Sequence, residues 1–306
     1  MLQFNKLSKH PDRFKRFTGL TLDEFIYLRN KTHPVWLNLE QKRLKRKNRI
    51  REIGGGRKSN LPTYDDELFL ILLHYRLYLT VEVLGYLIGL DDSNVCRHLV
   101  RLESLFAKMR LSFLTRPKGI KKINSLDELF EKYPDLVELT IDGTEQPTQR
   151  PKKRAKQKKY YSGKKKQHTI KTQIIITKDK RIFDISDSHP GSFHDYTIFK
   201  KYKTPDKIPK KSKIRVDKGY QGIEKDYPDI EVYLPKKATR GHTLTKKEKK
   251  ENKNLAKKRI YVEHVIGSLK RFKILSQKYR HDLKKYNSVI KNIASLQNMK
   301  FDLALT

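Results

Sequence analysis

The sequence predicts an α/β fold in which helices flank a mixed sheet and an all-α helix-turn-helix domain precedes it. Residues 61–106 carry three consecutive helical patterns separated by cap and turn residues. Residues 136–234 instead carry short β-branched runs bounded by turn residues, the pattern of strands. A third observation concerns charge: 70 Lys and Arg stand against 34 Asp and Glu, giving a formal net charge of +36.

This charge balance indicates a polyanionic partner. The excess is larger than solubility requires, and with a pI near 10 it favours nucleic acid over a membrane surface. The longest apolar run, Leu68–Leu73, is far shorter than the ~20 residues that span a bilayer, and the N-terminus lacks a signal-peptide core. We therefore expect a soluble, cytoplasmic protein without a membrane partner.

Cysteine usage restricts the possible metal chemistry. The single cysteine, Cys96, cannot form an intrachain disulfide and excludes a Cys-based zinc cluster. A metal would have to be held by oxygen or imidazole ligands.

The first 60 residues are expected to form a helical lobe and a basic linker. Thr21 and Glu24 have the spacing of a capping box, and Phe25 and Leu28 continue an apolar face. Residues 41–59 are basic and glycine-containing, which is typical of a connector. The role of this lobe stays open.

The helix-turn-helix domain is predicted over residues 61–122, ending in a basic linker near 116–122. Its first helix reaches about Leu79, the second spans Val81–Ile88 between Thr80 and Gly89, and Ser93 is the expected cap of the third. Opposite the apolar stripe of the third helix lie Arg97, His98 and Arg101, where a recognition helix needs DNA contacts. A plain three-helix packing unit is the alternative.

Strands are expected to begin the last domain, residues 123–306. The first is predicted over 136–141 and ends at Asp142; others follow over 170–177, 181–186, 214–216 and 232–234, with a helix over 195–201. Next come a basic helical insert over 236–258, an amphipathic helix over 259–272 and a final helix over 286–305. Strands followed by a carboxylate-bearing helix are the order of an RNase H-like sandwich.

Three carboxylates occupy positions suited to metal binding. Asp142 and Asp217 follow strands, and Glu263 lies on the amphipathic helix. Mg²⁺ prefers oxygen ligands, and a two-metal site that cuts a phosphodiester needs such a cluster. Taken singly, an aspartate after a strand is as readily a turn or cap residue, so the prediction depends on the set.

Four ordered blocks resemble a known family. They are Ile141-Asp142-Gly-Thr-Glu145 with Arg150-Pro151 and Tyr160–Lys166 downstream, His189–Asp195, Asp217–Gly222, and Arg259, Glu263 and Lys270 at fixed spacing. The set resembles bacterial insertion-sequence transposases of the DDE superfamily, in the group related to PIF/Harbinger transposases. A tyrosine that some relatives place before the arginine is replaced here by Ala256.

The resemblance implies that Asp142, Asp217 and Glu263 are catalytic and bind two Mg²⁺ ions, for which Mn²⁺ may substitute. Asp195 also matches a family aspartate and is the alternative ligand. Arg259 and Lys270 would then contact phosphates beside the cleavage site. No organic cofactor is implied, and the expected partners are double-stranded DNA, as transposon ends and target, and further copies of the chain in a homodimer or larger assembly.

Residues 150–166 form the strongest basic stretch. It holds ten Lys or Arg and no acid, so it suits backbone phosphates, while its tyrosines suit stacking on bases. The residues expected to bind DNA here are Arg150, Lys152, Lys153, Arg154, Tyr160, Tyr161 and Lys164. A solvated, disordered loop is the alternative.

These observations predict a transposase, acting at the bacterial nucleoid, that binds terminal inverted repeats, cleaves DNA with Mg²⁺ and joins the freed 3′-hydroxyls to a target. Two alternatives stay open: a transposase-derived DNA-binding protein, and an RNase H-like endonuclease that cuts without joining. A generic basic nucleic-acid binder would differ from all three in showing no metal dependence.

Overall fold

The computed structural model describes residues 1–45, 60–113, 125–238, 241 and 243–304. The chain divides into two compact units. The helical unit comprises Met1–Phe113, Lys270–Gln277 and Ser288–Thr306, and the sheet unit comprises Leu114–Leu269 and Lys278–Asn287. Most of the expected connector (46–59) and the expected linker near 116–122 lie outside the described residues, so the three-part domain division stays a prediction.

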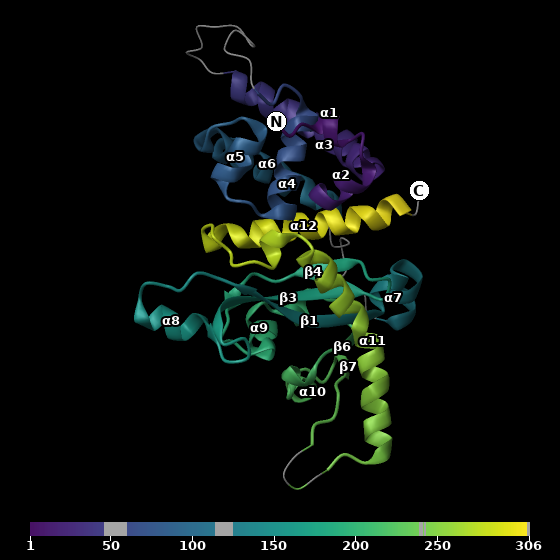
Figure 1. The fold of residues 1–306 in the computed structure, drawn as a ribbon. Helices are drawn as coiled ribbons and strands as arrows, with labels where there is room; N and C mark the ends of the chain where they lie inside the picture. The colour runs from purple at the N-terminus through teal and green to yellow at the C-terminus, as the bar shows by residue number, and fades with distance from the viewer. Residues whose placement is uncertain (46–59, 114–124, 239–240, 242, 305–306) are drawn as a thin grey trace. The chain divides into compact units, whose positions relative to one another are not determined.

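Six helices form most of the helical unit (Figure 1). They are α1 (Phe4–Leu7), α2 (Pro11–Thr18), α3 (Leu22–Leu44), α4 (Tyr64–Leu77), α5 (Val81–Ile88) and α6 (Asp92–Phe113). The rings of Phe4, Phe14, Phe25 and Phe69 pack against one another in its core, with Phe4 and Phe25 stacked at 4.8 Å between centroids. Aromatic pairs of this kind join α1 and α2 to the longer helices.

Local capping signals in this unit act as predicted. Thr21 and Glu24 form a capping box at the start of α3. Thr80 accepts a hydrogen bond from the Val83 N–H, and α5 ends at Gly89, which takes the left-handed conformation. One expectation was wrong: α6 begins at Asp92, so Ser93 lies inside the helix, and the Asp91 carbonyl accepts the Val95 N–H.

The expected recognition residues on α6 have different surroundings. Arg97 is exposed and donates to Asn94, whereas Arg101 contacts Glu40 at 3.2 Å and Glu67 at 3.3 Å. His98 also lies 3.3 Å from the Glu67 carboxylate. Two of the three side chains therefore contact acids of α3 and α4, and their assignment to DNA stays a prediction.

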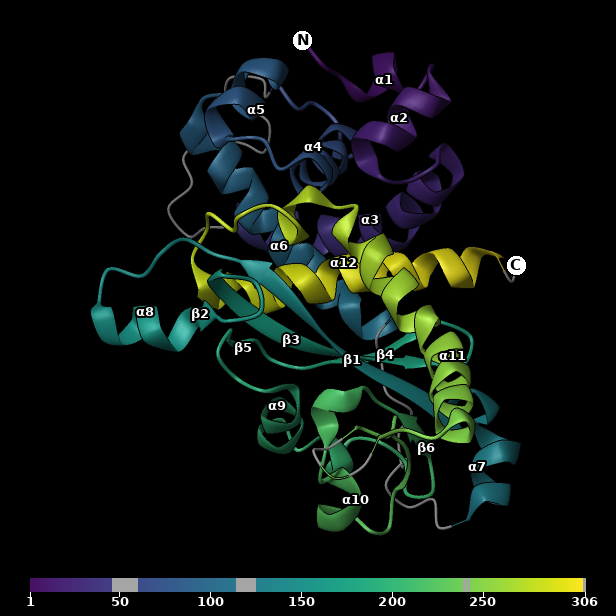
Figure 2. The ribbon, with the colours of Figure 1, turned by 60° about the horizontal axis from the view of Figure 1, so that its bottom comes forward.

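The sheet has seven strands. Five of them follow one another in the order β2–β3–β1–β6–β7, and β4 and β5 each pair with β3 (Figure 2; β7 is labelled in Figure 1). Their bounds are β1 Glu138–Pro147, β2 Tyr161–Ser162, β3 Gln167–Thr177, β4 Ile182–Ile185, β5 His189–Pro190, β6 Lys213–Arg215 and β7 Glu231–Tyr233. β3 is antiparallel to β1, while β6 and β7 run parallel to it. This mixed sheet with flanking helices confirms the predicted fold class.

The first strand is longer than predicted. It does not end at Asp142 but continues to Pro147, because Asp142 pairs with Ile174 of β3 and the pairing extends to Pro147 opposite Thr169. Asp142 therefore lies in the middle of a strand. β6, in contrast, ends at Arg215, two residues before Asp217.

Helices of the sheet unit are α7 (Leu126–Lys132), α8 (Arg154–Tyr160), α9 (Asp195–Lys201) and α10 (Ile223–Asp226), followed by α11 (Lys246–Lys270). Both the end of the expected insert and the expected amphipathic helix are helical, but the boundary predicted between them at residue 259 was wrong, because α11 is one continuous helix. It starts at the predicted capping box, in which Thr245 and Glu248 exchange hydrogen bonds. The last helix, α12, spans Leu283–Ala304.

The core fixes which face of β1 each side chain occupies. Leu139 and Ile141 are fully buried in a cluster that includes Phe199 of α9 and Ile223 of α10. Because side chains alternate along a strand, Glu138, Thr140 and Asp142 point to the opposite face. None of the described helices combines the length and hydropathy that a membrane span requires.

Glu67→Gln should destabilise the chain by about 3 kcal/mol at neutral pH, because it leaves the groups around a buried ion pair without their counter-charge. Burial alone would raise the pKa of Glu67, but bonds from His98, Arg101 and Trp36 lower it below its ordinary value. This contribution is therefore present above the ordinary carboxylate pKa and lost as pH falls through the lowered one.

Urea unfolding at neutral and acidic pH measures the difference in the free energy of unfolding between Glu67→Gln and wild type. The exposed Glu82→Gln on α5 is the matched control and should change stability little. Equal stability of Glu67→Gln and wild type at neutral pH would contradict the assigned role.

Candidate active site

Asp142 is a partly buried carboxylate of the predicted site. It lies mid-strand in β1, and its Oδ1 accepts the Gly143 N–H at 2.8 Å. Burial raises the pKa of Asp142 to about 6, and Asp217 and Asp195 act in the same direction, while Arg259 and the Gly143 N–H oppose them. The ionised form is thus only partly compensated, a common property of functional carboxylates.

Asp195, at the start of α9, lies between the two other aspartates. A Cβ atom added at Gly143 would lie 2.9 Å from its Oδ1, and one added at Gly219 would lie 3.4 Å from its Oδ2. Gly143 follows Asp142, and Gly219 follows Asp217 by two residues. The two glycines leave the space in which three aspartates from three elements come together.

Asp217 follows β6 and caps a short turn, its carboxylate accepting the Gly219 N–H. Its other oxygen lies 3.9 Å from Arg259 of α11, and Arg259 also contacts Glu263 at 3.2 Å. Arg259 therefore connects Asp217 to Glu263. The Glu263 side chain is 56% exposed, far more than the aspartates.

Lys171 of β3 belongs to the site although the sequence did not indicate it. Its ammonium donates to the Phe193 carbonyl at 2.9 Å and lies 3.5 Å from Asp195 and 3.7 Å from Glu145. A lysine in a strand whose side chains alternate between the two faces of a sheet carries no local sequence signal that it contacts acids of a site. Its contacts depend on α9 lying over β3, which only the folded chain shows.

The carboxylates suit a hard cation in their chemistry. Asp142, Asp195 and Asp217 present oxygen donors. A divalent ion would stabilise the ionised Asp142 carboxylate, whose pKa is raised by burial and, to a smaller extent, by Asp217 and Asp195. Among the described residues, no three His, Cys, Asp or Glu side chains stand close enough to hold one ion together. The carboxylates thus match a divalent cation in the type of donor atom and in charge.

A cavity of about 390 Å³ opens beside Asp217 and Arg259. Lys218, Lys249 and Lys253 line it together with Tyr233. Cationic walls next to the carboxylates suit a phosphate-bearing substrate.

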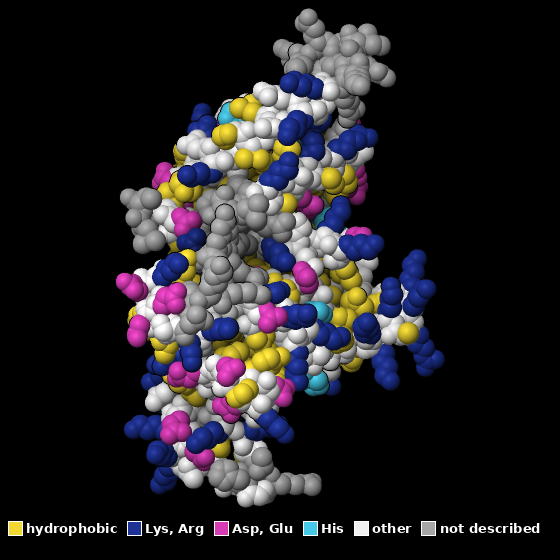
Figure 3. Space-filling model, turned by 180° about the vertical axis from the view of Figure 1, so that it is seen from behind, with side chains coloured by type: hydrophobic (Ala, Val, Ile, Leu, Met, Phe, Trp, Pro, Cys, Tyr) yellow, Lys and Arg dark blue, Asp and Glu magenta, His cyan; other side chains and the backbone are white. Residues whose placement is uncertain are grey.

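The basic stretch 150–166 forms a projecting element rather than only a loop. It contains α8, whose residues are not buried, and Figure 3 shows Lys and Arg side chains gathered on it. Arg150, Lys152, Lys153, Arg154, Tyr161 and Lys164 are exposed, and Tyr160 is partly buried. Lys270 is the last residue of α11, about two turns beyond Glu263.

Comparison with known proteins places these residues in a family context. Residues 141–298, which contain all four candidate carboxylates, match the family described as DDE superfamily endonuclease. The chain is also 32% identical over 293 residues to a "Probable transposase for insertion sequence element IS702" from Microchaete diplosiphon, covering 96% of this chain and 95% of that protein. No solved structure matches significantly.

Without divalent ions, Asp142→Asn should stabilise the protein above pH 6, because the amide removes a buried negative charge. The folded carboxyl has a pKa of about 6 against an ordinary value of 3.8, so the penalty grows as pH rises through this interval and is complete above it. The shift corresponds to on the order of 3 kcal/mol.

Unfolding in EDTA at about pH 8 and about pH 4 tests this sign. The variant should exceed wild type at the higher pH and approach it at the lower one. Asp229→Asn, an exposed substitution, should change little at either. A variant less stable than wild type at pH 8 would refute the argument that burial penalises the ionised Asp142 carboxylate.

Proposed function

This chain belongs to the DDE superfamily endonucleases, and we propose that it acts as the transposase of a bacterial insertion sequence, cleaving DNA at the element's ends and joining the 3′-hydroxyls to a target. The observation that carries this proposal is the gathering of Asp142, Asp195 and Asp217 beside Arg259, within the segment that matches the family.

We assign the catalytic, metal-binding positions to Asp142, Asp217 and Glu263. Bound Mg²⁺ would activate the attacking oxygen and stabilise the leaving one in phosphoryl transfer. The carboxylates supply its oxygen ligands, and Arg259 keeps Asp217 and Glu263 on one side of the site. Both cleavage and joining are transfers of the same kind, so a single site suffices.

Asp195 is assigned a positioning role. Lys171 already balances its charge from 3.5 Å, and its carboxylate packs against the backbone at Gly143 and Gly219. It therefore orients the segments that carry Asp142 and Asp217. Loss of such supporting contacts typically reduces activity about 10- to 100-fold.

Cleavage and strand transfer on a duplex carrying the element's terminal repeat test these assignments. Asp142→Asn, Asp217→Asn and Glu263→Gln should bind DNA but lose both reactions, whereas Asp195→Asn should keep about 1–10% of the activity. The exposed Asp229→Asn is the matched control and should retain full activity.

The outcomes separate the proposed transposase from its alternatives. Wild type that binds and never cuts is a DNA-binding derivative, and cutting without joined products indicates a nuclease. Full activity of all three substituted variants would remove the carboxylates from the mechanism.

DNA binding is proposed to involve the basic surface at α8, because Lys and Arg side chains gather there without acids. Substituting Lys152, Lys153 and Arg154 together by Gln should weaken duplex binding and reduce the slope of log K against log salt by about 2–3, since each phosphate contact contributes about 0.9. Fluorescence anisotropy over a salt series measures this slope.

The matched control replaces Lys246, Lys247 and Lys250 by Gln, which removes the same charge from the exposed start of α11. It should leave the slope nearly unchanged. Equal slopes for both triple variants would show that total charge, rather than the α8 surface, determines binding.

A further inference from the structure

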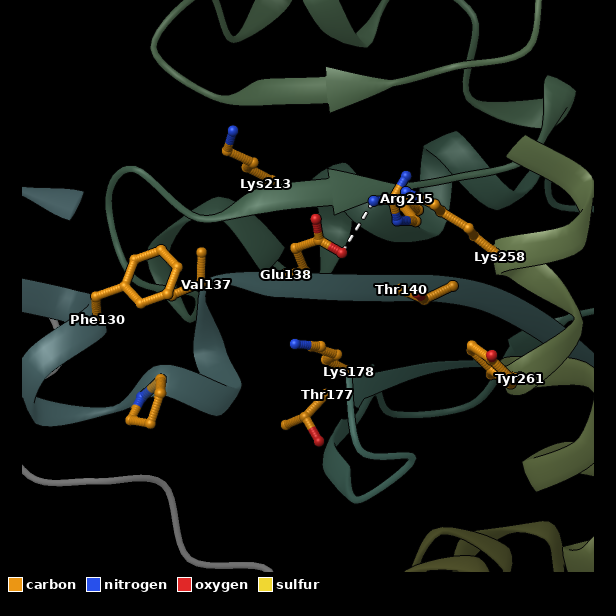
Figure 4. Close-up of a pocket in the computed structure, with 11 residues that line it drawn as sticks. Phe130, Val137, Glu138, Thr140, Thr177, Lys178, Lys213, Arg215, Lys258 and Tyr261 are labelled. Atoms are coloured by element: carbon orange, nitrogen blue, oxygen red, sulfur yellow. Dashed lines mark hydrogen bonds and ion pairs between the residues drawn. The ribbon is translucent and has the colours of Figure 1, made fainter. Parts of the chain in front are cut away.

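A second pocket lies in the sheet unit, outside the candidate active site. Side chains from α7, β1, β6 and α11 line it (Figure 4), and its volume is about 440 Å³. Pockets of this size hold small organic groups. None of the four candidate carboxylates lines it.

The pocket is cationic. Lys178, Lys213, Arg215 and Lys258 line it, and Glu138 is the one acid among the described lining residues. Glu231, beside the lining, pairs with Lys213 at 3.3 Å, so two net positive charges remain. The Arg215 guanidinium donates to Glu138 Oε2 at 2.9 Å, drawn as the dashed line in Figure 4. The occupant should therefore carry negative charge.

Two aromatic side chains border the same space. Phe130 of α7 is 58% exposed and Tyr261 of α11 is 43% exposed, and both line the pocket. Large exposed rings beside cations are the combination that single-stranded nucleic acid uses, with bases on the rings and phosphates on the cations.

The pocket and the carboxylates share one face of β1. Glu138 and Thr140 line the pocket, and strand alternation places them on the same face as Asp142. Four residues of strand separate Glu138 from Asp142 by about 13 Å, which is about four phosphates of one strand at 3.4 Å each. A DNA strand held at the carboxylates would thus reach the pocket.

We propose that this pocket holds unpaired nucleotides of the bound DNA strand, about four phosphates from the reacting one. Phe130 and Tyr261 lie at opposite ends of the pocket in Figure 4, so one base stacks on Tyr261, another stacks on Phe130, and a phosphate lies at Lys178 and Lys258. This inference rests on the proposed function and adds a binding subsite to it. Glu138 Oε1 accepts the amino group of a base in the pocket, so cytosine, adenine or guanine binds better than thymine.

Photo-crosslinking of the full chain to a short single strand tests the proposal, in EDTA so that the strand stays uncut. The probe contains one 5-iododeoxycytidine, and peptide mapping should place its crosslink at Phe130 or Tyr261. A probe with 5-iododeoxyuridine, which lacks the amino group, should crosslink there less.

A second test compares the affinity of variants for the single-stranded DNA. Phe130→Ala and Tyr261→Ala should each weaken binding of the single strand about tenfold by anisotropy, as expected for one lost stacking contact. Ile260→Ala is the control, because Ile260 is also 43% exposed on α11 but does not line the pocket. Phe130→Leu, which keeps an apolar side chain, should behave like Phe130→Ala.

Crosslinks that map only to other residues, or unchanged affinity of both ring variants, would overturn the proposal. Displacement of the strand by excess dCMP would also overturn it, by assigning the pocket to a free nucleotide. Metal-dependent cleavage without a crosslink in the pocket would refute the subsite alone, whereas the crosslink without any cleavage would refute only the proposed function.

Discussion

Burial of the Asp142 carboxylate beside two other acids is the constraint around which the candidate site is organised. Asp142, Asp195 and Asp217 come from three separate elements, and burial together with the other two acids raises the pKa of the first. Such a cluster persists only if cations stand close by. Arg259 of α11 and Lys171 of β3 meet that requirement, the first beside Asp217 and the second beside Asp195.

Space is the second requirement of this cluster. An added Cβ at Gly143 or Gly219 would come within 3 Å of an aspartate oxygen, closer than real Cβ atoms approach. The backbone itself therefore forms part of the wall around the carboxylates. This explains why glycine follows so closely after two of the acids, a feature that sequence patterns alone would attribute to turns.

Sequence patterns predicted those features that local chemistry determines. The boundaries of α5 follow from the Thr80 cap and Gly89, and both were found as predicted. The end of β1 was missed because its continuation past Asp142 depends on pairing with β3, some thirty residues later in the chain. Likewise, α11 continues through the change from a mostly charged to an amphipathic pattern, since no residue there ends a helix.

Of the candidate site, the sequence predicted the carboxylates and Arg259 but not Lys171. Lys171 acquires its contacts only when α9 lies over β3, and Arg101 meets Glu40 and Glu67 only when α3, α4 and α6 pack together. Charged residues on a helix face or strand give the same sequence signal whether they contact DNA or a neighbouring acid. Their partners decide between the two, and partners distant in sequence have no local signature.

The hydrophobic core also determines the geometry of the chemistry. Leu139 and Ile141 are both fully buried, which fixes the register of β1. A slip of one residue would expose both and turn Asp142 into the core. The same alternation places Glu138 and Thr140 on the face of Asp142. Burial of Leu139 and Ile141 therefore orients both the carboxylate and the residues that line the neighbouring pocket. Placing both sites on a central strand keeps their separation constant. β1 is buried on one face and is paired on both sides at its first three residues, so it has little freedom to shift.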